Sequence, residues 1–147
     1  MKKSKIVIIP SAASLIKMKK EIMKIKGINL ANVMHKIGES AGNDFFEYCI
    51  KDVKGRKNKI KKILEVLNLT EYGKYKLKKM SKNSIIIKIT KSPFTKLCSR
   101  NKKLSCHWTC GLLSGLFNNI NKEWLFEKSK CKDLGYSYCE FKGKRIR

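Results

Sequence analysis

Six cysteines are the residues best suited to chemistry in this chain of 147 residues, and five of them fall between residues 98 and 139. Grouped cysteines in a reducing compartment bind metal or do redox work more often than they form disulfides. The apolar run at residues 6–9 is too short for a signal-peptide core, so we expect a cytoplasmic protein and read the cysteines as metal ligands. The five are Cys98, Cys106, Cys110, Cys131 and Cys139.

The spacing around Cys131 and Cys139 predicts that their thiolates are neighbours. Three residues separate each of them from Gly135, which permits the bend of a hairpin loop, so the two strands return the thiolates to one place. Glu127 precedes Cys131 by four residues on the same predicted strand. Because side chains alternate along a strand, its carboxylate is expected on the Cys131 side.

Cys106 opens a predicted helix, where unpaired backbone N–H groups and the helix dipole favour the thiolate. Three thiolates and one further oxygen, nitrogen or sulfur ligand satisfy tetrahedral zinc. We therefore predict a closed, structural zinc site. Glu127, Cys110 and His107 compete for the fourth position, while Cys49 is interpreted as a small core residue.

The first half of the chain has helical periodicity. Ser11 can cap a first helix that Gly27 ends, and Asn29 can cap a second that runs as far as Tyr48. A basic loop at residues 54–58 leads to a third helix, which ends near residue 70. Gly38 and Gly42 make a notch in the second helix that predicts a close helix approach, with core packing favoured over a subunit contact.

The second half changes period and predicts β-β-α-β-β. Alternating residues at 74–78 and 85–89 indicate a hairpin, residues 106–120 a helix with its own glycines Gly111 and Gly115, and residues 124–131 and 138–142 a second hairpin. The predicted architecture is α+β, with N-terminal helices and an antiparallel sheet covered by helices. We expect one domain over residues 1–147.

The charge balance is strongly basic, with 35 Lys and Arg against 11 Asp and Glu and a net charge of +24. Such a charge suggests partners that carry phosphate. However, nucleic-acid binders usually concentrate their basic residues on one face, whereas Lys is spread along this chain, and Arg, which reads base edges, is scarce. Nucleic-acid binding is therefore an alternative that the sequence disfavours. No apolar run is long enough to span a bilayer.

The block at residues 106–115, together with Glu127, Cys131, Gly135 and Cys139, resembles the 4-vinyl reductase domain family. Members are small-molecule-binding modules, which occur alone in archaea and as sensory domains of regulators that respond to phenolic compounds. The resemblance covers most of the chain and is most specific over residues 106–141. Since no output segment follows the block, this chain is similar to the stand-alone, archaeal-like members.

The resemblance implies zinc held by Cys106, Glu127, Cys131 and Cys139, an apolar pocket between sheet and helices, and a homodimer. The ligand would be a small hydrophobic or aromatic molecule. Six residues are candidates for the wall of the pocket, although residues of these types are more often plain core than pocket wall. They are Trp108, Phe117, Phe45, Tyr48, Ile87 and Phe126.

An enzymatic alternative follows from the family name: a reductase, or a reductase accessory, that acts on a vinyl-substituted tetrapyrrole. The sequence has no glycine-rich dinucleotide loop, and a closed zinc site has no vacant position to activate water or substrate. A binding role is therefore favoured over catalysis, and catalysis is left undecided.

Overall fold

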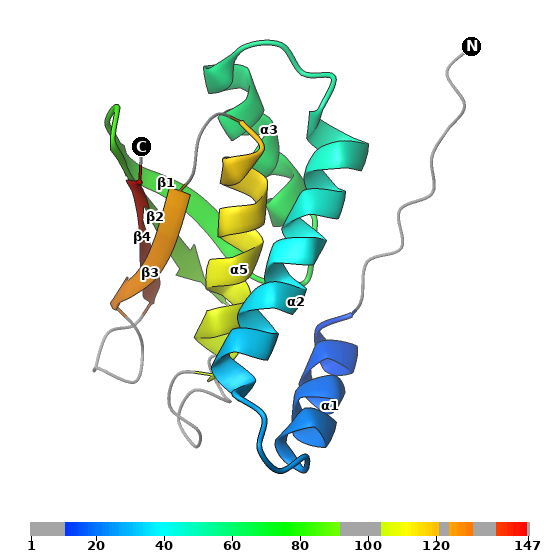
Figure 1. Cartoon of the computed structure of the whole chain (residues 1–147). Helices are drawn as coiled ribbons and strands as arrows, with labels where there is room; N and C mark the ends of the chain where they lie inside the picture. Colours follow the sequence, from blue (N-terminus) through cyan, green and yellow to red (C-terminus); the bar gives the residue numbers. More distant parts are fainter. Residues whose placement is uncertain (1–10, 92–103, 121–123, 131–137, 147) are drawn as a thin grey trace, which may run out of the picture.

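The order of helices and strands confirms the predicted α+β class. The structure is a computed structural model that describes residues 11–91, 104–120, 124–130 and 138–146 (Figure 1). Its elements are α1 (Ala12–Met23), α2 (Leu30–Phe45), the π-helix η1 (Phe46–Ile50), α3 (Arg56–Asn68), β1 (Lys74–Met80), β2 (Ser84–Thr90), α5 (Leu104–Asn118), β3 (Trp124–Lys130) and β4 (Cys139–Arg145).

The described strands form one antiparallel sheet in the order β1-β2-β4-β3. The two hairpins predicted from the sequence therefore sit side by side, joined through β2 and β4. Ile85, Ile87 and Ile89 alternate with more exposed residues along β2 and turn toward the helices. The helices cover this face of the sheet (Figure 1). The lysines that alternate with the buried residues of β1 and β2 belong to the opposite face.

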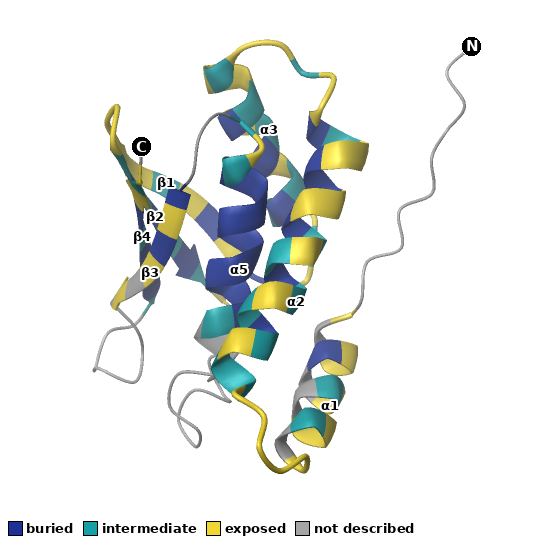
Figure 2. Cartoon of the chain, in the orientation of Figure 1, coloured by how far each residue is buried: buried dark blue, intermediate teal, exposed yellow. Residues whose placement is uncertain are grey.

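Helix α5 lies between the sheet and α2, and residues 108–117 are all buried, so the helix is enclosed around its whole circumference (Figure 2). Four glycines explain how α2 and α5 approach so closely. A Cβ at Gly38 or Gly42 would clash with backbone atoms of α5, and one at Gly111 or Gly115 would clash with backbone atoms of α2. The notches predicted from the sequence therefore serve the core.

The predicted N-caps are confirmed: the Ser11 side chain accepts from the Ser14 N–H, and the Asn29 side chain accepts from the Asn32 N–H. The predicted basic loop at residues 54–58 is wrong in part, because α3 begins at Arg56. Lysine and arginine are good helix formers when exposed, and Gly55, with φ +90°, makes the turn before them. No helix in the described part of the chain is long and apolar enough to cross a membrane.

Candidate functional site

Two of the predicted zinc ligands, Cys106 and Cys139, belong to element ends on the same side of the molecule. The first turn of α5, which contains Cys106, and the start of β4, where Cys139 is the first residue, are at the same end of the molecule (Figure 1). Cys139 is buried. The side chain of Cys106 and all of Cys131 and Cys98 lie outside the described residues, so the three-thiolate site stays a prediction.

Glu127 is not brought to Cys139. On β4, Cys139 has the same side-chain direction as Phe141 and Gly143, which are buried, and Gly143 pairs with Phe126. Glu127 pairs instead with Lys142 and is exposed on the opposite face of the sheet. A bulge between Lys128 and Lys130 lies further along the strand and does not alter this pairing.

This placement favours the other two candidates for the fourth ligand, Cys110 and His107, which are both on α5 near Cys106. Cys110 is 7% exposed and belongs to the buried core, and His107 is partly exposed. Among the residues that the structure describes, no three His, Cys, Asp or Glu are grouped to hold a metal ion.

Five of the six candidate pocket-wall residues are core residues. Trp108, Phe45, Ile87, Phe117 and Phe126 are each at most 4% exposed, and the rings of Phe117 and Phe126 pack with their centroids 5.2 Å apart. Tyr48, on η1, is 50% exposed. Their role as a ligand wall stays a prediction, because neither of the two pockets described below is lined by any of them.

A pocket of about 420 Å³ lies where the helical layer meets the turn between α3 and β1. Its wall is formed by the residue that precedes α1, a cysteine of η1, an apolar side chain within α3 and another just after its end, and the turn that follows α3. Its lining residues are Ser11, Cys49, Val66, Leu69, Thr70, Glu71 and Tyr72. We refer to it as the apolar pocket.

The turn that forms one side of the apolar pocket is held by Thr70. Its hydroxyl donates to the Leu67 carbonyl at 2.6 Å and accepts from the Tyr72 N–H at 3.2 Å, so it caps α3 and orients Tyr72 together. Gly73 follows with φ +127°, a conformation that glycine adopts without strain. The chain can therefore leave the helix abruptly and enter β1.

Tyr72 forms the inner wall of the apolar pocket. It is 1% exposed, and its ring meets that of Trp108 edge-on, with centroids 4.9 Å apart and planes at 70°. Burial, with a smaller effect of the Glu71 charge, raises the pKa of Tyr72 to about 12. The phenol is therefore neutral at physiological pH, and it connects the pocket to Trp108 of the predicted wall.

The opposite wall comes from η1, a π-helix that continues α2. The sequence predicts an unbroken α-helix as far as Tyr48, whereas the helix changes to the wider π turn at Phe46. Such turns recur at functional sites because they reorient side chains within a continuous helix. Here the partly buried Cys49 lines the apolar pocket.

The residues that line the apolar pocket were not identified from the sequence as binding residues. Val66 and Leu69 read as members of a helix, and Thr70 as its end, because helical periodicity does not reveal which residues a turn will bring together. Cys49 was interpreted as core and is partly buried at the pocket wall. Tyr72 next to Gly73 is the one local hint, since it places an aromatic residue at a helix-to-strand turn.

No protein-family model matches this chain, and no curated protein sequence matches it. Similarity to known proteins is therefore seen in the structure alone.

The fold is shared with solved structures of low sequence identity. The phenol-responsive sensory domain of the transcription activator PoxR, solved with phenol, matches with a TM-score of 0.76 and 15% identity, over 95% of this chain and 76% of that one. A vinyl-4-reductase family protein from Methanocaldococcus jannaschii matches with a TM-score of 0.62 and 15% identity, over 90% of this chain and 77% of that one.

A third similar structure is a trafficking protein particle complex subunit 3 from Naegleria fowleri, covalently bound to palmitic acid. It matches with a TM-score of 0.68 and 14% identity, over 92% of this chain and 90% of that one. Identities this low establish the fold and not the function. At the level of the fold, they confirm the resemblance to the 4-vinyl reductase domain that the cysteine block indicates.

Proposed function

We propose that this chain is a small-molecule-binding domain of the sensor type, which takes a small hydrophobic or aromatic ligand in the apolar pocket. The observation that carries the proposal is the pocket itself. Its volume of about 420 Å³ falls in the range of about 300 to 1,000 Å³ that is usual for ligand sites. Its lining is mainly apolar, with few polar groups, as such sites require.

The similar structures support this class of ligand. One of them was solved with phenol, an aromatic molecule, and another was covalently bound to palmitic acid, an aliphatic one. In this chain, the Tyr72 ring offers an aromatic surface, while Val66 and Leu69 offer aliphatic ones. Glu71 adds an exposed carboxylate at the pocket, which disfavours anionic ligands, so a neutral ligand fits best.

The contact between Tyr72 and Trp108 supplies the test. A Trp124→Phe variant leaves Trp108 as the sole tryptophan, one side chain away from the pocket. Phenol, decanol and decanoic acid are each titrated into this variant while the fluorescence of Trp108 is recorded. We expect a saturable change in Trp108 emission with phenol or decanol, and weaker binding of decanoic acid than of decanol because of Glu71.

Val66→Phe in the same background fills the apolar pocket and should weaken binding by about tenfold or more, since overpacking leaves no room for the ligand. Val33→Phe is the matched control, because it makes the same change on α2 at a partly exposed position outside the pocket lining. Equal affinities of the two variants, or no saturable response to any of the three probes, would contradict the proposal.

We also propose that zinc is bound at the end of the molecule where α5 and β4 begin. Cys139 fits such a role because it is a buried thiol at that end, and Cys106 and Cys131 are the thiols that the sequence brings to it. Cys110 or His107 would complete the set, since Glu127 faces the other side of the sheet. Zinc would join the start of α5 to the last hairpin.

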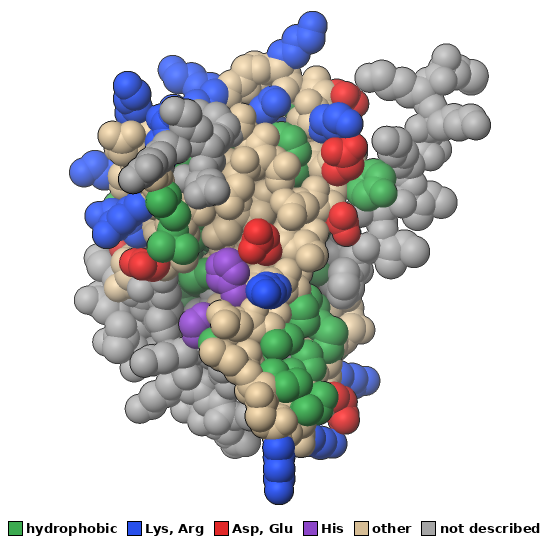
Figure 3. All heavy atoms as spheres, in the orientation of Figure 1, with side chains coloured by type: hydrophobic (Ala, Val, Ile, Leu, Met, Phe, Trp, Pro, Cys, Tyr) green, Lys and Arg blue, Asp and Glu red, His purple; other side chains and the backbone are tan. Residues whose placement is uncertain are grey.

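A homodimer completes the proposal. An apolar patch on the surface supports it: Ile25 and Ile28, in the connection between α1 and α2, are 55% and 40% exposed. Figure 3 shows hydrophobic side chains gathered over this part of the molecule. Exposed apolar surface of this kind is typical of contacts between proteins.

A further inference from the structure

A second pocket, of about 370 Å³, lies at the β1 edge of the sheet, where the face that the helices leave uncovered meets the end of α3. The side chains of Lys74, Lys76 and Lys88 belong to this face, because Tyr75 and Ile87, their neighbours along the strands, are buried on the helix side. Lysines dominate its lining, which consists of Asn68, Lys74, Tyr75, Lys76, Lys88 and Thr90. We refer to it as the lysine pocket.

Strand register forces two of these lysines together. Lys76 on β1 pairs directly with Lys88 on β2, and Lys74 pairs with Thr90 in the next outward-facing row. Like charges placed directly opposite one another destabilise an antiparallel pair. The sheet therefore holds three cations around one pocket at a cost that a bound anion would relieve.

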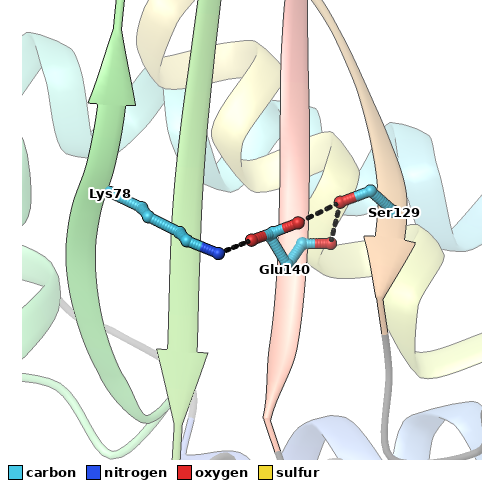
Figure 4. A network of polar contacts seen from close by, with 3 residues as sticks. All are labelled: Lys78, Ser129 and Glu140. Carbon is cyan, nitrogen blue, oxygen red and sulfur yellow. Dashed lines mark hydrogen bonds and ion pairs between the residues drawn. The ribbon is translucent and has the colours of Figure 1, made fainter. Parts of the chain in front are cut away.

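Nearby negative charge relieves this repulsion only in part, because Glu140 pairs directly with Lys88 across β2 and β4 but is engaged by other side chains. Glu140 is the buried carboxylate of this face, and it is already bonded: Lys78 donates to it at 2.8 Å, and the Ser129 hydroxyl donates to its other oxygen at 2.9 Å (Figure 4). The hydrogen bond to Glu140 is also the main reason why the pKa of Lys78 is raised. Lys78 is thereby matched with its own partner and is separate from the lysine pocket.

The three pocket lysines form no such ion pair within the described residues, where the ion pairs include none of Lys74, Lys76 and Lys88. No carboxylate is among the described residues that line the lysine pocket. The Lys88 ammonium lies 4.2 Å from the centre of the Tyr138 ring. That contact orients the ammonium group without cancelling its charge.

We propose that the lysine pocket binds a compact polyvalent anion of the phosphate type, such as the diphosphate group of a free pyrophosphate or of a nucleotide. Three ammonium groups supply charge-assisted donors, and the Thr90 hydroxyl supplies a neutral one. The Asn68 amide is not a ligand, because it is bonded to the backbone N–H and carbonyl of Tyr75 at 2.7 and 3.0 Å.

A compact anion fits the observations better than a nucleic-acid strand. Three lysines converge on one pocket of bounded volume, whereas strand binding relies on a long basic groove and several aromatic platforms. Basic side chains are also distributed over much of the visible surface (Figure 3), and they attract any polyanion weakly. The test must therefore separate the pocket from the overall charge.

The test measures binding of pyrophosphate, adenosine diphosphate and adenosine by isothermal titration calorimetry at physiological ionic strength. Lys74→Gln/Lys76→Gln removes two charges from the lysine pocket. Lys57→Gln/Lys61→Gln removes the same number from exposed positions of α3 and is the matched control. We expect the pocket variant to bind pyrophosphate about tenfold more weakly or worse, the control to match the wild type, and adenosine not to bind.

Thermal unfolding gives a second readout. Without an anion, the pocket variant should be at least as stable as the wild type, because a repulsive pair is lost. Pyrophosphate should raise the unfolding temperature of the wild type and the control, but not that of the pocket variant. If binding of adenosine diphosphate is weakened in the pocket variant as binding of pyrophosphate is, the phosphate groups are the recognised feature.

Equal weakening in the two double variants would overturn the proposal, because the overall charge would then account for binding. Tighter binding of a single-stranded oligonucleotide than of pyrophosphate, lost equally in both variants, would overturn it in favour of a nucleic-acid surface. The proposal is independent of the apolar pocket, since neither double variant touches a residue that lines it.

Discussion

At the scale of single residues, Asn68 shows how one side chain can join two elements. Its amide accepts from the Tyr75 N–H and donates to the Tyr75 carbonyl, so it satisfies a backbone unit of the edge strand β1 as another strand would. Asn68 ends α3, and Thr70 shapes the next turn. The two side chains together set the position of Tyr72 and therefore the inner wall of the apolar pocket.

Asn68→Asp should lower the free energy of unfolding by about 1 to 3 kcal/mol, because a carboxylate would face the Tyr75 carbonyl where a donor is needed. Chemical denaturation measures the change. Asn58→Asp is the control, since the Asn58 amide makes a single bond, to the Lys54 carbonyl, at an exposed site and should change stability by about 0.5 kcal/mol or less. Equal losses in the two variants would contradict the strand-like role of Asn68.

At the scale of elements, the crossing of α2 and α5 determines the position of everything on α5. The backbones meet at Gly38, Gly42, Gly111 and Gly115, so no side chain separates the two helices. Trp108 and Leu112 pack beside the contact and reach the core, and Trp108 thereby meets Tyr72. The helix pair is the scaffold that brings Trp108 to the apolar pocket.

Gly111→Ala should destabilise the protein by about 1 to 3 kcal/mol or more, because the added methyl would meet the backbone carbonyl of His35 and the helices would have to separate. The sign of the change in stability is diagnostic, because helix propensity alone would make the replacement of glycine by alanine stabilising by about 1 kcal/mol. Ser40→Ala, on the exposed side of α2, is the control and should be neutral or slightly stabilising. Urea unfolding compares them, and a stabilised Gly111→Ala would refute the close crossing.

At the scale of the whole molecule, the apolar pocket and the proposed zinc site are formed by different helices and strands. The apolar pocket lies among α1, η1, α3 and the turn before β1, whereas the proposed zinc would hold the start of α5 and the last hairpin. Figure 1 places the start of α5 and the beginning of β4 at one end of the sheet. Loss of zinc should therefore loosen the last hairpin before it loosens the helices.

Native mass spectrometry of freshly purified protein should find one zinc per chain and a dimer, and Cys131→Ser should lose the metal together with much of the thermal stability, since structural metal binding contributes to folding. Cys49→Ser makes the same change at the apolar pocket and should keep the metal. Hydrogen exchange after chelation should show the last hairpin opening first. Full zinc occupancy of Cys131→Ser would refute ligation by Cys131.

The sequence by itself determined the elements and much of their order. Helical and alternating periodicity identified helices and strands, Ser11 and Asn29 marked two helix starts, and Gly38 and Gly42 indicated a close crossing. These features are local: each depends on residues a few positions apart, so they can be read along the chain. The start of α3 and the π turn at Phe46 were missed, because exposed lysines and a single wide turn leave the periodicity almost unchanged.

Only the tertiary structure decided which surfaces these elements share. Strand pairing placed Glu127 and Cys139 on opposite faces of the sheet, and it made Lys76 the direct cross-strand partner of Lys88. The turn after α3 brought Tyr72 between Cys49 and Trp108. Such juxtapositions depend on register and on contacts between distant segments. Alternation along a strand identifies its buried face, but it does not say which residue of a distant strand each position pairs with, and that pairing is decided only when the strands come together.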